Sequence, residues 1–92
     1  MDVLSQEQID AALGDLEGWG FADGALTRTF RLADFARAVD FVEQLADVAE
    51  GMQHHPDIDI RYNKVTLRLA THSAGGVTTR DVELAAALDR LA

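Results

Sequence analysis

The chain has 92 residues, 48% of them hydrophobic, and carries 16 acidic against 8 basic residues, for a formal net charge of −8. This length allows one hydrophobic core and not two, so we expect a single domain over residues 1–92. The acidic balance and the scattered basic residues argue against nucleic acid or an anionic membrane as a ligand, and the lack of cysteine excludes disulfides and thiolate chemistry.

The N-terminal residues lack a basic patch followed by an apolar run, and no stretch approaches the roughly 20 apolar residues of a membrane span. We therefore expect a cytoplasmic protein. A domain this small buries only part of its surface, so a second subunit would help to wall a binding site. We accordingly expect a homo-oligomer.

The first predicted elements are a helix and a hairpin. Ser5 and Gln8 form a capping-box pattern, and apolar residues then recur at helical spacing until Gly18. Asp23-Gly24 is a strong signal for a two-residue hairpin turn. Folding the chain there pairs two positions on each strand: Phe21 with Leu26, and Trp19 with Arg28.

The longest predicted helix begins after Asp34, its expected N-cap, and weakens at Gly51. Its apolar face consists of Phe35, Ala38, Val39, Val42, Leu45, Ala46, Ala49 and Met52. After Pro56 an alternation of apolar and polar residues predicts two half-buried strands joined by a turn at Asn63-Lys64.

A two-residue turn at Asn63-Lys64 gives the second hairpin a self-consistent register. It pairs Tyr62 with Val65, Ile60 with Leu67 and Ile58 with Leu69 on one face, and Asp59 with Arg68 on the other. Continued outward, the register sets His55 opposite His72, with His54 beside them. Pro56 lacks an N–H and will fray the ladder, so the prediction concerns the proximity of the histidines and not their hydrogen bonds.

The last predicted helix is capped by Thr78 and Asp81. Its apolar stripe consists of Val82, Ala85, Leu88 and Leu91. The element order is therefore α-β-β-α-β-β-α. Two hairpins interleaved with helices predict an α+β fold, in which a four-stranded antiparallel sheet carries the helices on one face.

All three histidines lie between Glu50 and Asp81, and we interpret this segment as the active site of an acid–base enzyme. Histidine can both donate and accept a proton near neutral pH. Two other interpretations are a solvated turn and a zinc site. Zinc is disfavoured because adjacent His54 and His55 point apart on an extended backbone, and because no His-x-x-x-His or Cys-x-x-Cys spacing occurs.

These residues resemble the motif of the pterin-4a-carbinolamine dehydratases, also called dimerisation cofactors of a homeodomain transcription factor. The motif's positions are filled at the expected spacing by Glu50, His54, His55, Pro56, Tyr62, His72 and Asp81. Asn63-Lys64-Val65 and Thr71-His72 are also similar to the family, and the resemblance covers nearly the whole chain. One departure is Ala74, where some relatives carry a cysteine that this acid–base chemistry does not need.

The resemblance implies dehydration of 4a-hydroxytetrahydropterin to quinonoid dihydropterin and water, without a metal or an organic cofactor. It implies that His54 is the principal acid or base and that Glu50 orients it. His55 and His72 would handle the second proton and hold the pterin, in either order. The implied substrate-binding residues are Trp19, Asp81, Pro56 and Thr71, with Asp81 orienting a histidine or arginine. The family further implies a dimer or tetramer.

An alternative function is a non-enzymatic binding or assembly module on the same fold, because relatives include transcriptional cofactors and carboxylase assembly factors. Relatives recruited to such work need not keep the full histidine set, whereas this chain has it. The sequence therefore favours the enzyme.

Overall fold

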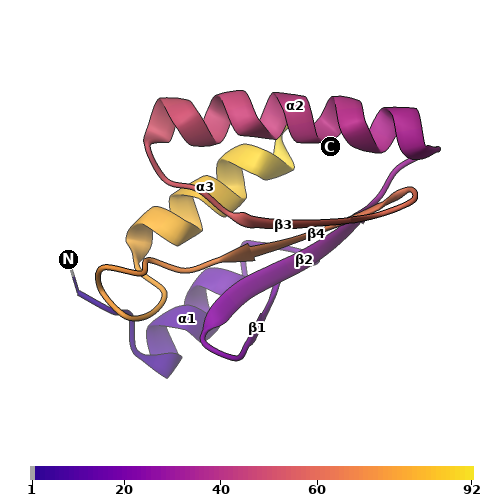
Figure 1. Ribbon diagram of the computed structural model, residues 1–92. Helices are drawn as coiled ribbons and strands as arrows, with labels where there is room; N and C mark the ends of the chain where they lie inside the picture. The colour runs from indigo at the N-terminus through magenta and orange to yellow at the C-terminus, as the bar shows by residue number, and fades with distance from the viewer. Residues whose placement is uncertain (1) are drawn as a thin grey trace.

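The computed structural model describes residues 2–92. Its elements are α1 (Gln6–Leu13), β1 (Gly20–Ala22), β2 (Ala25–Arg31), α2 (Phe35–Met52), β3 (Asp57–Arg61), β4 (Lys64–Leu69) and α3 (Thr79–Asp89). The strands form one antiparallel sheet in the order β1-β2-β4-β3. The predicted α+β class and element order are confirmed (Figure 1).

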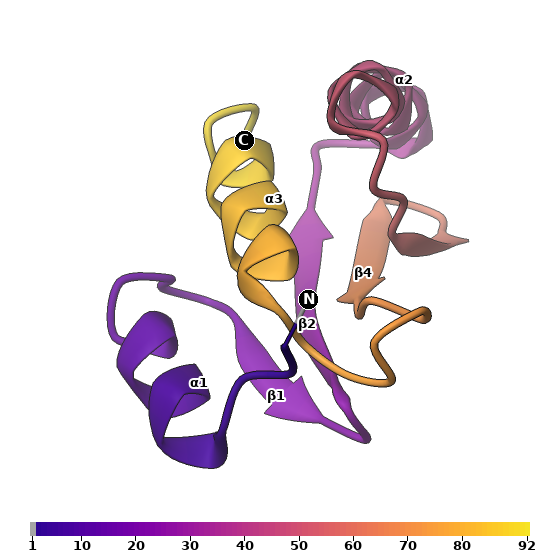
Figure 2. The ribbon, with the colours of Figure 1, turned by 90° about the vertical axis from the view of Figure 1, so that its left-hand side faces the viewer.

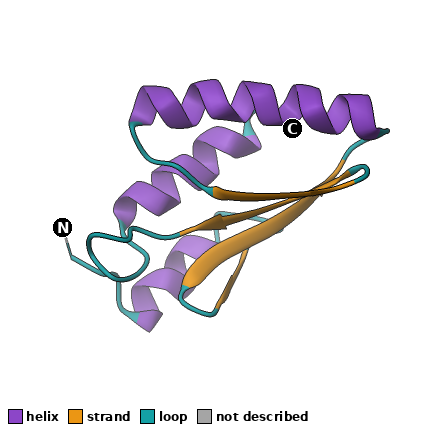
Figure 3. Ribbon diagram, viewed as in Figure 1, coloured by secondary structure: helices purple, strands orange, loops and turns teal. Residues whose placement is uncertain are grey.

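The helices lie on one face of the sheet, and the core fills the space between the two layers (Figures 2 and 3). Side chains of strand β4 alternate between the two faces of the sheet, and Val65, Leu67 and Leu69, on the face toward the helices, are fully buried. On the helical side, Leu45 of α2 and Leu84 of α3 are equally buried. The described helices include none with the length and apolar character to cross a membrane.

Both predicted capping boxes are present. The Ser5 hydroxyl accepts from the N–H of Gln8 at 3.2 Å, and the Gln8 side chain accepts from the N–H of Ser5 at 2.8 Å. Thr78 and Asp81 form the same reciprocal pair at the start of α3. The predicted first helix was too long, because α1 ends at Leu13 and the chain turns before Gly18.

Helix α2 begins after Asp34 as predicted, and the Asp34 carboxylate accepts from the N–H of Arg37 at 2.8 Å. Its predicted apolar face was wrong at Phe35 and at Ala46, which are both exposed. Phe35 is 54% exposed, whereas Phe41, which the predicted face omitted, is buried and packs against Phe30 of β2. The remaining buried positions of α2, Ala38, Leu45 and Ala49, were predicted.

The first hairpin has the predicted turn and pairs Phe21 with Leu26, with Asp23 and Gly24 both at positive φ. The predicted register of the second hairpin was wrong, because its turn is Tyr62-Asn63. Ile58 therefore pairs with Leu67, Ile60 with Val65, and Asp57 with Arg68.

A tertiary contact explains the shifted turn. Asn63 is tied to Leu32, which follows β2: the Leu32 N–H donates to the Asn63 carbonyl at 2.8 Å, and the Asn63 amide donates to the Leu32 carbonyl at 2.9 Å. These bonds extend the β2–β4 pairing by one residue, so the reversal must occur at Tyr62. The shift keeps the side chains of both strands on their predicted faces, because each residue of β3 pairs two positions away from its predicted partner and side chains alternate with a period of two.

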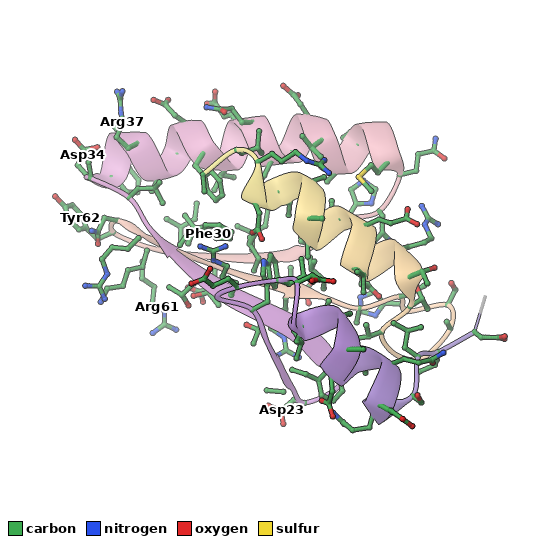
Figure 4. The ribbon with its side chains drawn as sticks, turned by 180° about the vertical axis from the view of Figure 1, so that it is seen from behind. Asp23, Phe30, Asp34, Arg37, Arg61 and Tyr62 are labelled. Carbon is green, nitrogen blue, oxygen red and sulfur yellow. The ribbon has the colours of Figure 1, made fainter. Side chains whose placement is uncertain are left out.

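Strand β3 is not half-buried as predicted. All five of its residues are exposed, including Ile58 at 41% and Ile60 at 39%. It forms an edge of the sheet. Its hairpin turn, where the side chains of Arg61 and Tyr62 project outward, lies at the other end of β2 from Asp23 (Figure 4).

Candidate active site

The end of α2 sets the directions of the first two histidines. Gln53 adopts the left-handed conformation, with φ 52°, and its N–H donates to the carbonyl of Glu50 at 3.1 Å. The N–H of His54 donates to the carbonyl of Ala49 at 3.1 Å, which completes a Schellman motif. The chain therefore reverses abruptly, and His54 is buried while the next residue, His55, is exposed.

His54 forms a buried pair with Asp81 of α3. Its Nε2 lies 2.5 Å from the Asp81 Oδ1, His54 is only 8% exposed, and Asp81 is fully buried. An ionised carboxylate can only accept, so the His54 Nε2 carries the hydrogen of this bond. Nδ1 is then the ring nitrogen that can exchange a proton.

The second oxygen of Asp81 is equally occupied. Its Oδ2 accepts from the Thr71 hydroxyl and from the Thr78 N–H, each at 2.9 Å. Because Thr71 gives its single hydroxyl hydrogen to Asp81, the Thr78 hydroxyl donates to Thr71 at 2.8 Å. Asp81 thus caps α3 and orients His54 at the same time.

His55 forms a second, exposed pair with Glu50. Its Nε2 contacts the Glu50 Oε2, and their side chains are 63% and 74% exposed. This pairing differs from the expectation that Glu50 orients His54. Glu50 lies on the outer side of the last turn of α2, where only the outward-facing histidine can meet it.

His72 comes from the loop between β4 and α3. The loop closes on itself through an isolated bridge between Thr71 and Gly76, and Gly75 turns it with φ 82°. His72 is exposed, and its side chain makes no hydrogen bond to any residue between 2 and 92. It is therefore the unpaired imidazole of the three.

Two adjoining cavities bring the histidines together. A cavity of about 260 Å³ is lined by all three histidines with Gln53, Ala70, Thr71, Ser73 and Arg80. A second, of about 330 Å³, shares His55, Ala70 and His72 with the first and continues past Arg68 to the Asp23-Gly24 turn. The predicted proximity of His55 and His72 is thus present, although the shifted register places His55 beyond the paired part of β3.

The structure does not bring Trp19 to the histidines. Trp19 is 7% exposed, lines neither cavity, and donates from its indole N–H to the Asp89 carboxylate at 2.8 Å. Arg28, its predicted cross-strand partner, donates to the same oxygen at 2.9 Å. Asp89 ends α3, about 12 Å from Asp81 at ~1.5 Å per residue. No sequence signal pointed to Asp89.

Of the other predicted substrate-binding residues, Thr71 lines the smaller cavity and is 6% exposed, so most of its surface faces Asp81. Pro56 is half-buried between His55 and β3 and lines neither cavity. Arg80 was not predicted, although it adjoins Asp81 and lines the cavity. Among residues 2–92 no group of three or more histidine and carboxylate side chains is arranged to hold a metal ion.

The fold and site define a class of protein: a small α+β domain that gathers three imidazoles around one pair of cavities, two of them paired with the carboxylates of Asp81 and Glu50. Residues 2–91 match the family model described as pterin 4 alpha carbinolamine dehydratase. The chain belongs to this family, and the resemblance predicted from the motif is confirmed.

Several relatives match over nearly the full chain. One from Mycolicibacterium vanbaalenii, named pterin-4-alpha-carbinolamine dehydratase, is 52% identical, with 97% of this chain and 96% of the relative covered. One of the same name from Herpetosiphon aurantiacus is 47% identical, with 99% and 95% covered. A crystal structure of a transcriptional coactivator/pterin dehydratase from Brucella melitensis superposes with a TM-score of 0.94 at 39% identity, covering 99% of both chains.

Proposed function

We propose that the chain dehydrates a 4a-hydroxytetrahydropterin to quinonoid dihydropterin and water. In this reaction the C4a–O bond breaks, the N5–H proton is removed, and the electron pair on N5 forms the C4a=N5 double bond. The leaving hydroxide takes a proton and departs as water. The chain must therefore present one group that gives a proton to the C4a oxygen and one that takes the proton from N5.

The observation that carries the proposal is that His55 and His72 line the same two cavities, and that of these two only His55 has a side-chain partner among residues 2–92. His55 contacts the carboxylate of Glu50, which fixes the direction of its imidazole at the cavities. We assign it to protonate the leaving oxygen. His72 has no side-chain partner among the described residues, so it is free to accept the proton from N5.

His54 takes a different place in this proposal from the principal role that the motif implied. Its Nε2 is committed to Asp81 and little of its ring reaches the cavity. These contacts favour a fixed hydrogen-bonding group that holds the pterin, with Asp81 setting its tautomer. Thr71 supports it through Asp81.

We also propose that the protein works as a homo-oligomer in the cytoplasm. The exposed edge of β3, with Ile58 and Ile60 at its surface, supports self-association, because an edge strand has one side open for pairing and its apolar side chains gain from burial by another chain. Whether two or four copies assemble is measured by light scattering. Cell fractionation tests the compartment.

The proposed activity is tested by generating 4a-hydroxytetrahydropterin and following quinonoid dihydropterin by absorbance. The folded protein should accelerate its appearance over the buffer rate in proportion to protein concentration. A well-folded protein that leaves the buffer rate unchanged contradicts the proposal.

A further inference from the structure

The carbonyl groups at the C-terminal end of α2 bear partial negative charge, and no basic side chain in the last turn of α2 balances it. The last turn of α2 contains no basic residue and includes the acidic Glu50. The Schellman bonds use the carbonyls of Ala49 and Glu50. A cation placed beyond them is favourable, because the unsatisfied carbonyls at the end of a helix bear partial negative charge.

Arg80 supplies that cation from α3. Its guanidinium donates to the carbonyl of Met52 at 2.8 Å and to the carbonyl of Gln53 at 3.0 Å. These are the two residues that immediately precede His54. Arg80 in turn immediately precedes Asp81, which binds the His54 ring. Two neighbouring residues of α3 thus hold both the backbone before His54 and its side chain.

The backbone that Arg80 holds is strained. Gln53 lies at φ 52°, in the left-handed region that residues other than glycine rarely adopt. Such a conformation persists only where the surrounding structure enforces it. This residue sets where His54 and His55 leave the helix. A change in its dihedral angles would rotate both imidazoles relative to Asp81 and the cavity.

We propose that Arg80 is a positioning residue that fixes Gln53 in its left-handed conformation and so aims the histidine pair. The part of this inference that concerns turnover rests on the proposed function. The part that concerns the geometry of His54 rests on the structure alone. Arg80 also lines the smaller cavity, but both of its hydrogen bonds go to the backbone of α2.

The test compares the wild-type protein with Arg80→Gln, which removes the charge and shortens the side chain that reaches the Met52 and Gln53 carbonyls. Arg90→Gln is the matched control, because Arg90 is exposed at the other end of α3. Two quantities are measured: the steady-state kcat and KM, and the ¹⁵N and ¹H resonances of the His54 ring. Unfolding curves and circular dichroism establish that each variant is folded.

Arg80→Gln should lower kcat by about 10- to 100-fold, because misplacing reacting groups by ~1 Å costs rates of this size. Its KM should rise as well, because Arg80 lines the smaller cavity and His54 is the proposed pterin-holding group. The His54 ring resonances should shift, whereas Arg90→Gln should match wild type in both measurements. Arg80→Lys retains the charge and can reach one carbonyl, so its kcat should lie between wild type and Arg80→Gln.

Unmoved His54 resonances in Arg80→Gln overturn the inference, whatever happens to kcat. If Arg80→Gln does not fold, Arg80→Lys decides the matter by the same resonances. If the wild-type protein does not dehydrate the pterin, the proposed function fails, and the resonances alone still decide the role of Arg80.

Discussion

At the scale of single residues, Asp81 has two roles: it orients the His54 ring and it caps the start of α3. One oxygen orients His54, and the other accepts from the Thr71 hydroxyl and from the N–H of Thr78, the N-cap of α3. The Thr78–Asp81 capping pattern was predicted from sequence. The histidine that Asp81 holds was not identified, because that choice depends on the left-handed turn at Gln53, which no glycine or asparagine announces.

Removing the hydroxyl of Thr71 tests this network. Thr71→Val keeps the shape but leaves the Asp81 Oδ2 with one donor and the Thr78 hydroxyl without its acceptor. We expect a loss of about 1–3 kcal/mol in the free energy of unfolding, measured in urea. Thr71→Ser keeps the hydroxyl and should lose less. Equal stability of Thr71→Val and wild type would show that the hydroxyl adds nothing.

At the scale of elements, the capping residues predicted where the helices begin, whereas the turn residues predicted only one of the two hairpins correctly. The first hairpin was predicted because Asp23-Gly24 supplies both positive φ angles locally. The second hairpin turns at Tyr62 because Asn63 is bound to Leu32, a contact far away in the sequence. A local sequence pattern carries no information about such a contact. For this reason the predicted turn lay one residue too late.

Tyr62 makes this turn at a conformational cost. It lies at φ 53° and is 68% exposed, so it gives up little packing. Tyr62→Gly should raise the free energy of unfolding by up to about 1 kcal/mol, because relief of the ~1–2 kcal/mol cost of the left-handed conformation exceeds the ~0.4–1 kcal/mol that glycine adds to the entropy of the unfolded chain. Tyr62→Val should lower it, since a branched Cβ is disfavoured there. A less stable glycine variant in urea unfolding would contradict this account.

At the scale of the whole molecule, the two edges of the sheet differ in exposure: β1 is partly buried, whereas β3 is exposed. The short strand β1 forms one edge beside α1, whereas β3 exposes every residue. The sequence pattern predicted apolar residues on β3 but could not predict that nothing within residues 2–92 covers Ile58 and Ile60. Burial by a second copy is the proposed explanation.

Charge on the β3 edge should therefore dissociate the oligomer. Ile60→Lys places an ammonium at a position that is 39% exposed in the single chain, so the fold itself should tolerate it. We expect a smaller species than wild type by size exclusion with light scattering. Glu83→Lys, an exposed site on α3, is the control and should leave the mass unchanged. An unchanged mass for Ile60→Lys would place the interface elsewhere.

The central claim is that His55, paired with Glu50 at the shared cavity, gives the proton that the leaving hydroxide requires. The most direct measurement is the dehydration rate of His55→Gln relative to wild type at equal concentrations of folded protein. Loss of a general acid should reduce kcat by about 10²–10⁴-fold. His55→Gln turning over at the wild-type rate would contradict the claim.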